Sequence, residues 1–114
     1  MELNFKKTGN IVSIYLKGRL DVHYSADIEQ ELERLVPLYP ASHFLINMKD
    51  VEYISSSGLR IIVMTMKLLK AQERKLVLCC INEAVRKVFE VVQVIDMFDI
   101  FASEEKGVEF LQNL

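Results

Sequence analysis

The segment Ile54-Ser55-Ser56-Ser57-Gly58-Leu59 lies between an apolar stretch, residues 44–48, and a segment with helical apolar spacing, residues 59–69. The serines are therefore predicted to lie where a buried strand has ended and a helix begins. The first N–H groups of a helix have no intrahelical partner and lie at the positive end of its dipole. A phosphate formed there would meet hydrogen-bond donors, so a serine at this junction is suited to act as a switch.

Upstream of the junction, the pattern predicts a hairpin. Apolar and polar residues alternate at residues 3–6 and again at residues 12–17, as in strands with one buried face. Gly9-Asn10, between the two segments, is typical of a tight turn. We therefore expect two antiparallel strands at the start of the chain.

A helix is expected to follow the hairpin. Ser25 is a candidate cap, and apolar residues at helical spacing follow it as far as Val36. Pro37 and Pro40 are expected to stop this helix. After the apolar strand at residues 44–48, the polar residues 49–53 are expected to form a loop leading to the serines.

Downstream of the junction, helices and strands alternate. The helix expected at residues 58–72 is apolar on nearly all sides, so protein must cover it or it must offer apolar surface to a partner. Residues 76–81 predict a strand central to a parallel sheet. Asn82 and Ser103 are expected to start two more helices, with a strand around Phe98 and Ile100 between them. The order ββαβαβαβα predicts an α/β fold with a mostly parallel central sheet and helices packed on it.

Length and charge limit the possible functions. The 114 residues fit a single domain, 1–114, and the formal net charge of −2 comes without a basic stripe, which argues against direct nucleic-acid binding. No apolar run approaches the ~20 residues that a membrane helix needs, so no membrane insertion is expected. Met1-Glu2-Leu3-Asn4 lacks the features of a signal peptide, and the expected location is the cytoplasm.

The chain has few groups for catalysis or metal binding. Cys79 and Cys80 are adjacent, so they would point to opposite faces of a strand and cannot readily pair; two small buried hydrophobes are expected. No cysteine–histidine spacing suggests a metal site, and no cofactor is expected. A serine nucleophile needs a base within reach, and the two histidines, His23 and His43, lie just after one predicted strand and just before another. The motif G-x-S-x-G and the Gly-rich phosphate loops are also absent, so an enzyme is not expected.

The serines themselves allow two interpretations. One serine can cap the helix while the others have no special role, since serine is a common cap. The alternative is that a serine accepts a phosphate. Two motifs favour the second: residues 50–59 resemble the D-S-[ST]-G-L segment of the STAS family, which includes the bacterial anti-sigma factor antagonists, and Gly18-Arg19-Leu20-Asp21 resembles that family's G-x-L-D. Chain length and element order match the family over the whole sequence.

The resemblance implies specific roles for residues at the junction. Ser56 occupies the position of the phosphoacceptor, and Ser57 and Gly58 match the residues that follow it. Ser55 stands where the family usually has aspartate, which removes a negative charge beside the acceptor. Asp21, Ser55, Ser57 and Gly58 would then shape the docking surface, with Gly58 letting a partner backbone approach closely.

The resemblance also implies a partner. Unphosphorylated antagonists of this family bind an anti-sigma factor, often a serine kinase that uses ATP, and so free its sigma factor for transcription; a phosphatase reverses the modification. Phosphorylation adds about −1.5 to −2 charges at the docking surface, where an unpaired charge is costly to desolvate. Arg60, one helical turn after Ser56, could pair with the phosphate, and the alternative is a solvated arginine.

Two other functions are compatible with the same fold. One is a STAS subunit of a lipid or anion transport system, without a phosphorylation switch, which the serine at position 55 makes credible. The other is a small-ligand binding module in which the apolar helix from Leu59 covers a pocket. Binding of the anti-sigma factor and phosphorylation by the cognate kinase would distinguish the switch from both.

Overall fold

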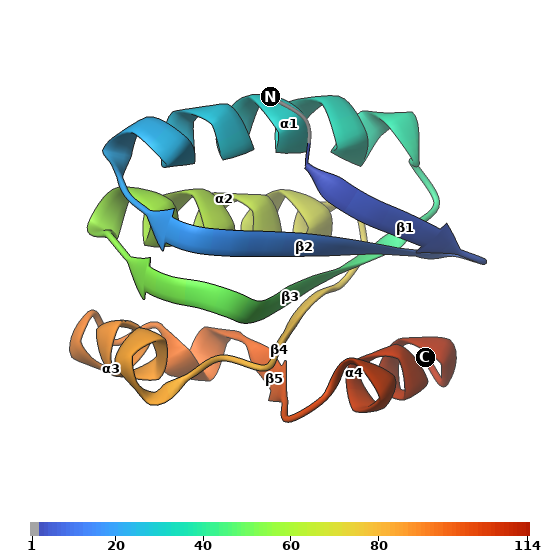
Figure 1. The fold of residues 1–114 in the computed structure, drawn as a ribbon. Coiled ribbons are helices and arrows are strands. Elements are labelled where there is room, and N and C mark those ends of the chain that lie inside the picture. Colours follow the sequence, from blue (N-terminus) through green and yellow to red (C-terminus); the bar gives the residue numbers. More distant parts are fainter. Residues whose placement is uncertain (1–2) are drawn as a thin grey trace.

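The computed structural model describes residues 3–114 and contains one five-stranded sheet in the order β1-β2-β3-β4-β5 (Figure 1). Only the β1–β2 pair is antiparallel, and the remaining neighbours are parallel. The elements are β1 Asn4–Thr8, β2 Ile11–Leu20, α1 Val22–Leu38, β3 His43–Ile54, α2 Ser56–Ala71, β4 Leu76–Cys79, α3 Glu83–Val91, the short 3-10 helix η1 Ile95–Met97, β5 Asp99–Phe101 and α4 Glu104–Gln112. The predicted α/β class and element order are confirmed. Met1 and Glu2, on which the expectation of no signal peptide partly rests, lie outside the described residues.

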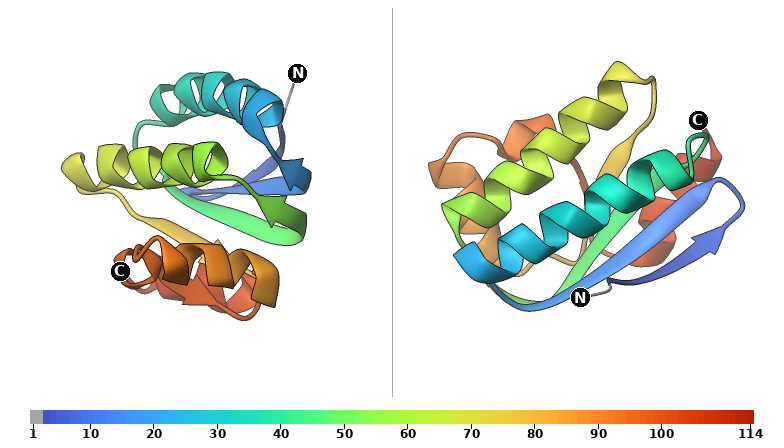
Figure 2. Two further views of the ribbon diagram at one scale, coloured as in Figure 1. Left: turned by 90° about the vertical axis from the view of Figure 1, so that its left-hand side faces the viewer. Right: turned by 90° about the horizontal axis from the view of Figure 1, so that it is seen from above.

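The helices form two layers. Helices α1 and α2 lie side by side on one face of the sheet, and α3 and α4 lie on the other (Figure 2). The larger core cluster includes fully buried residues of β2, β3 and α2, such as Ile14, Ile46 and Leu69, and a smaller one lies beneath α4 around Leu45 and Val77. The alternating apolar faces of the strands are thus covered on both sides.

Helix α1 differs from the prediction at both ends. It begins at Val22, and Asp21 caps it by accepting a hydrogen bond from the Tyr24 N–H at 3.0 Å. Ser25, the predicted cap, lies within the helix and is buried. Pro37 also lies within the helix, one residue before its end. A proline so close to the end costs few hydrogen bonds, and the Tyr39 N–H still reaches the Leu35 carbonyl.

Strand β3 is longer than predicted. Residues 49–53, expected to form a loop, continue the strand and pair with the second half of β2. Lys49, Asp50 and Glu52 are charged and exposed for a structural reason, because β4 pairs only with residues 44–47 of β3 and leaves the second half of β3 next to β2 alone. The β2–β3 register also shifts twice there, between Tyr15 and Lys17 and between Gly18 and Arg19, which breaks simple alternation.

The predictions for the second half of the chain need smaller corrections. The helix expected at 58–72 begins two residues earlier, at Ser56, and the strand expected at 76–81 ends at Cys79. Cys80 follows that strand with φ of +65°, and both cysteines are free; Cys79 is buried as predicted, whereas Cys80 is only partly buried. Asn82 and Ser103 cap their helices as predicted, with acceptor distances of 2.8 and 3.2 Å. Within residues 3–114, no helix is long and apolar enough to cross a membrane.

Candidate functional site at the junction of β3 and α2

Ser55 holds the junction together. Its hydroxyl oxygen accepts a hydrogen bond from the Gly58 N–H at 3.1 Å and donates to the Leu20 carbonyl oxygen at 2.8 Å. It is therefore the N-cap of α2, and its side chain is half-buried. Of the three serines, Ser55 has the structural role, and its hydroxyl hydrogen is already in use.

Ser56 is the exposed serine of the three. It is the first residue of α2, whereas Ser55 and Ser57 are only partly exposed. The Gly58 N–H is bonded to Ser55 and the Leu59 N–H to the Ser55 carbonyl. The N–H groups of Ser56 and Ser57 have no carbonyl one turn earlier in the helix, so they remain available to an anion. A phosphate on Ser56 would therefore form beside free donors and in contact with solvent.

The Leu20 carbonyl joins the two motifs that the sequence singled out. It accepts from the Ser55 N–H at 2.9 Å as well as from the Ser55 hydroxyl. Leu20 is the last residue of β2, and Asp21 follows it directly. The start of α1 and the start of α2 are thus fixed against each other at the carboxyl ends of two neighbouring parallel strands, the usual place for binding sites in α/β folds.

Gly58 has a packing role within the domain. It is buried, and a Cβ atom there would lie 3.0 Å from the Leu20 carbonyl oxygen and 3.1 Å from Cγ1 of Ile54. The absent side chain therefore admits the end of β2. Gly58 packs against the ends of β2 and β3, and its contact with a partner backbone stays a prediction.

Asp21 lies at the same edge and is exposed. One carboxylate oxygen, Oδ1, accepts the Tyr24 N–H as the cap of α1. Near this edge, the Arg19 guanidinium lies over the Tyr53 ring at 4.5 Å, and Tyr53 is 40% exposed. Charged and aromatic groups therefore flank the serines on the side of β2.

A hollow of about 430 Å³ lies next to Ser56 on the other side of α2. Its lining residues come from α2 and from the segment after α3: Ser56, Leu59, Arg60, Val63, Met64, Lys67, Val92 and Val94. Arg60 extends away from Ser56 and donates from Nη1 to the Met64 sulfur at 3.3 Å. The predicted pairing of Arg60 with a phosphate would therefore require this exposed side chain to turn back by one helical turn.

The sequence predicted neither this hollow next to Ser56 nor the hydrogen bonds from Ser55 to the Leu20 carbonyl. The hollow had a signal in the apolar residues Val92 and Val94, which line it, and Val92 is 50% exposed in the structure. Hydrogen bonding to the main chain at Leu20 leaves no signal in side-chain identity. His43, one of the two histidines, begins β3, whereas Ser55 follows the other end of that strand.

The fold and the serine-started helix at the carboxyl edge define a domain of the STAS type, and the comparisons agree. Residues 2–107 match the STAS domain family. An anti-sigma-B factor antagonist of Bacillus subtilis (strain 168) is 34% identical over 110 residues, which are 96% of this chain and 98% of that protein. The chain belongs to the STAS domain family, and its relatives include anti-sigma factor antagonists.

Solved structures show the same fold at lower identity. The anti-sigma factor antagonist SpoIIAA in its unphosphorylated form matches with a TM-score of 0.85 and 22% identity, over 98% of this chain and 97% of that one. An anti-sigma factor antagonist from Mycobacterium paratuberculosis gives 0.86 and 17%, over 96% and 92% of the two chains.

Proposed function

We propose that this protein is an anti-sigma factor antagonist whose binding is switched off by phosphorylation of Ser56. The observation that carries the proposal is that the two serines differ at the junction: Ser55 caps α2, and Ser56 is exposed beside unused N–H groups. The kinship with anti-sigma factor antagonists supports the choice of partner. The protein acts in this proposal by binding, with the anti-sigma factor as the kinase and a separate phosphatase restoring the hydroxyl.

The docking surface combines apolar and charged parts around Ser56. On one side lie Asp21 and the stacked pair Arg19–Tyr53, and on the other lies the hollow that Val92 and Met64 line. Apolar side chains provide area that a partner can cover, and the charges around them fix its orientation. A phosphate on Ser56 would stand within this surface, so the partner would have to desolvate about −1.5 to −2 charges to remain bound.

The neutral Ser55 gives a phosphate on Ser56 a less negative neighbour than the aspartate that the STAS family usually has at this position. A serine caps the helix without a charge, so a phosphate on Ser56 would not face an adjacent carboxylate. Repulsion at the phosphorylated site would be weaker than with aspartate at this position. The free phosphoprotein is accordingly expected to keep its fold, with the N-terminus of α2 stabilising the phosphate.

The first experiment is affinity capture from the native host with wild type, Ser56→Ala and Ser56→Asp as baits, followed by mass spectrometry. We expect an ATP-binding anti-sigma factor on wild type and Ser56→Ala and its loss on Ser56→Asp. Incubation of the captured kinase with ATP should then phosphorylate wild type and the matched control Ser57→Ala, but not Ser56→Ala. Transport subunits retained equally by all baits, without phosphorylation, would instead support the transport alternative.

Arg60 is tested separately. If it pairs with the phosphate, Arg60→Ala lowers the thermal stability of the phosphorylated protein and leaves that of the unphosphorylated protein unchanged. Lys67→Ala, which removes the other cation lining the hollow, is the matched control. Equal thermal stability and equal phosphorylation rates in wild type and Arg60→Ala would show that Arg60 is a solvated side chain.

A further inference from the structure

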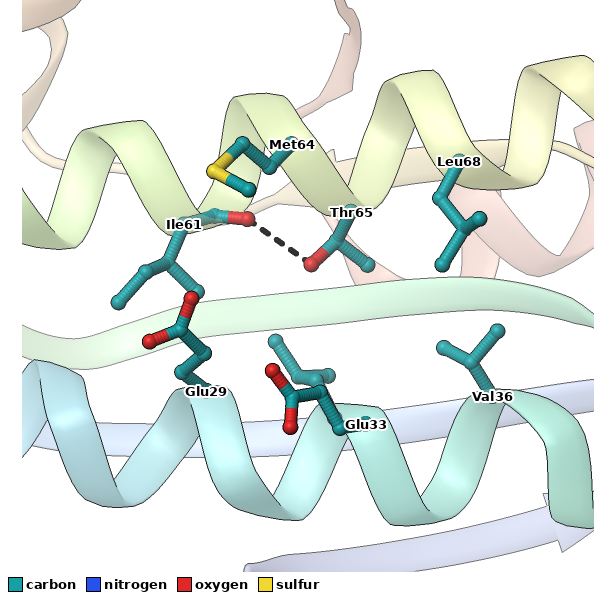
Figure 3. Close-up of a pocket in the computed structure, with 8 residues that line it drawn as sticks. Glu29, Glu33, Val36, Ile61, Met64, Thr65 and Leu68 are labelled. Atoms are coloured by element: carbon teal, nitrogen blue, oxygen red, sulfur yellow. Dashed lines mark hydrogen bonds between the residues drawn. The ribbon is translucent and has the colours of Figure 1, made fainter.

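The exposed side of α2 separates two hollows whose charges have opposite signs. The groove between α1 and α2, of about 230 Å³, has only Glu29 and Glu33 as charged lining residues among those that the structure describes (Figure 3). Among the described residues that line the hollow on the far side of α2, the only charged ones are Arg60 and Lys67. The two hollows therefore form an acidic flank and a basic flank on either side of one helix.

The ridge between the flanks is apolar. Met64 lines both hollows and is 49% exposed, and Leu68, which faces Val36 across the groove, is 48% exposed. Met64 and Leu68 are the large apolar residues of the ridge, and the small residues Ser57 and Ala71 lie on the same side of α2, seven positions before and after Met64. An apolar ridge with charged flanks is the pattern of a helix that packs against another helix.

The four flanking charges have no partners of their own. Within residues 3–114 the ion pairs are Lys6–Glu104, Arg34–Glu31 and Lys75–Asp99, and none involves the two flanks. Arg60 contacts only the Met64 sulfur through a hydrogen bond. The acidic and basic flanks are therefore both free to meet charges of another molecule.

A second copy of the chain supplies the matching charges in one orientation only. A two-fold axis parallel to α2 exchanges the flanks, so the acidic flank of each copy faces the basic flank of the other. A two-fold axis that lies in the interface and is perpendicular to α2 would make the helices antiparallel and would instead place acidic flank against acidic flank and basic flank against basic flank. We infer that the chain self-associates through α2, with the two α2 helices parallel, Met64 near the axis and Glu29 and Glu33 opposite Arg60 and Lys67 of the second copy.

This arrangement has a consequence for regulation, which rests on the proposed function. The basic flank includes Ser56, so self-association covers the serine and the hollow beside it. Two parallel α2 helices also bring both Ser56 residues to the same end of the pair. Self-association would thus compete with the anti-sigma factor, and phosphates on both copies would separate the pair by repulsion.

Self-association is measured on the full chain without a partner, so that its failure and the failure of the proposed function are separate results. Sedimentation equilibrium over a concentration series should show a reversible shift from 13.2 kDa towards twice that mass. The association constant should fall several-fold between low and high salt, because the flanks attract through exposed charges. A monomer at every concentration up to millimolar would overturn the inference.

Charge exchange tests the pairing of the flanks. The variants Glu29→Lys/Glu33→Lys and Arg60→Glu/Lys67→Glu should each be monomeric, and an equimolar mixture of the two should associate again. Glu105→Lys/Glu109→Lys on α4 changes the same charge at the same spacing and should associate like wild type. If each double variant associates as strongly as wild type, the α2 face is not the interface.

Cross-linking tests the direction of the helices. Ser57→Cys in a Cys80→Ser background should form a disulfide between copies, because parallel helices bring the two residues 57 together. Lys106→Cys in the same background is the control and should not. A disulfide between Ser57→Cys and Ala71→Cys in a mixture, in preference to one between two residues 57, would show antiparallel helices and overturn the arrangement.

Discussion

The two ends of the parallel strands use polar groups in opposite ways. At the amino end, Arg74 is 7% exposed, and its guanidinium donates to the carbonyls of Ser42, Tyr39 and Val36 and to the Gln72 side chain. At the carboxyl end, Ser56 is exposed and the first N–H groups of α2 remain open. Saturated polar groups fix the ends of elements, whereas open ones can receive a ligand or a modification. The contrast separates the end that maintains the fold from the end proposed to bind.

The largest expected effect is a loss of stability at the amino end of the parallel strands, where Arg74 donates its hydrogen bonds. Arg74→Ala removes a donor from three carbonyls at the end of α1 and just before β3, of which the Tyr39 carbonyl keeps the Ser42 N–H, and should lower the free energy of unfolding by about 3 kcal/mol. Urea denaturation measures the change. Lys75→Ala, which removes an ion pair with Asp99 whose two side chains are both about half exposed, is the control and should cost less than ~1 kcal/mol. Equal losses in the two variants would contradict the role assigned to Arg74.

The next largest effect is expected at the buried Gly58, at the carboxyl end of the parallel strands. Gly58→Ala forces a Cβ atom against the Leu20 carbonyl oxygen at 3.0 Å, and should lower the free energy of unfolding by about 2 kcal/mol through overpacking. It should also weaken partner binding, because the capped start of α2 must move. Thermal denaturation and binding affinity measure the two effects. An unchanged melting temperature would show that β2 yields at no cost.

A comparison of neighbouring serines sharpens the contrast within the open end. Ser55→Ala removes the cap and the bond to Leu20, and should cost about 1 kcal/mol of unfolding free energy. Ser56→Ala should change stability by less than ~0.5 kcal/mol, since this side chain is exposed. Denaturant titration of both variants under one set of conditions is the test. A larger loss for Ser56→Ala would mean that Ser56 has the structural role.

The smallest effect is a pH dependence at the saturated end. Burial, and then the charges of Arg74 and Lys75, lower the pKa of His43, whose Nδ1 accepts the Lys75 N–H at 3.0 Å. The unfolded chain takes up a proton at the ordinary value of about 6.5, before the folded protein does. Stability is therefore fully present above pH 6.5 and is lost as the pH falls through the lowered pKa. Melting temperatures from pH 7.5 to 5.5 should fall more steeply in wild type than in His43→Asn, and parallel curves would contradict this.

The element order could be predicted from sequence because it follows from local patterns. Apolar spacing located every strand and α-helix but not the 3-10 helix η1, and the caps Asn82 and Ser103 were identified by residue type and position. Ser25 was predicted as a cap by the same reasoning, but Asp21 lies at the true boundary, and the helix includes both Ser25 and Pro37. The second half of β3 was missed because a strand with only one neighbour keeps polar residues.

The site could be predicted in part. The two motifs and the serine-started helix followed from the sequence, and the structure brings the motifs together at the Leu20 carbonyl. The buried position of Gly58 and the hollow beside Ser56 depend on how distant segments pack, which no local pattern encodes. Arg74, the most connected polar side chain, also gave no signal, because its acceptors are all but one main-chain carbonyls.

The bond between Ser55 and the Leu20 carbonyl has a consequence for protein engineering. The acceptor is a main-chain atom, so any apolar residue that fills the place of Leu20 would present the same oxygen to the serine. A segment spanning residues 54–59 could therefore be transplanted between domains of this fold wherever β2 ends at the same level. What a chimera must preserve is the length of one strand, and the chemistry of the acceptor comes with the backbone.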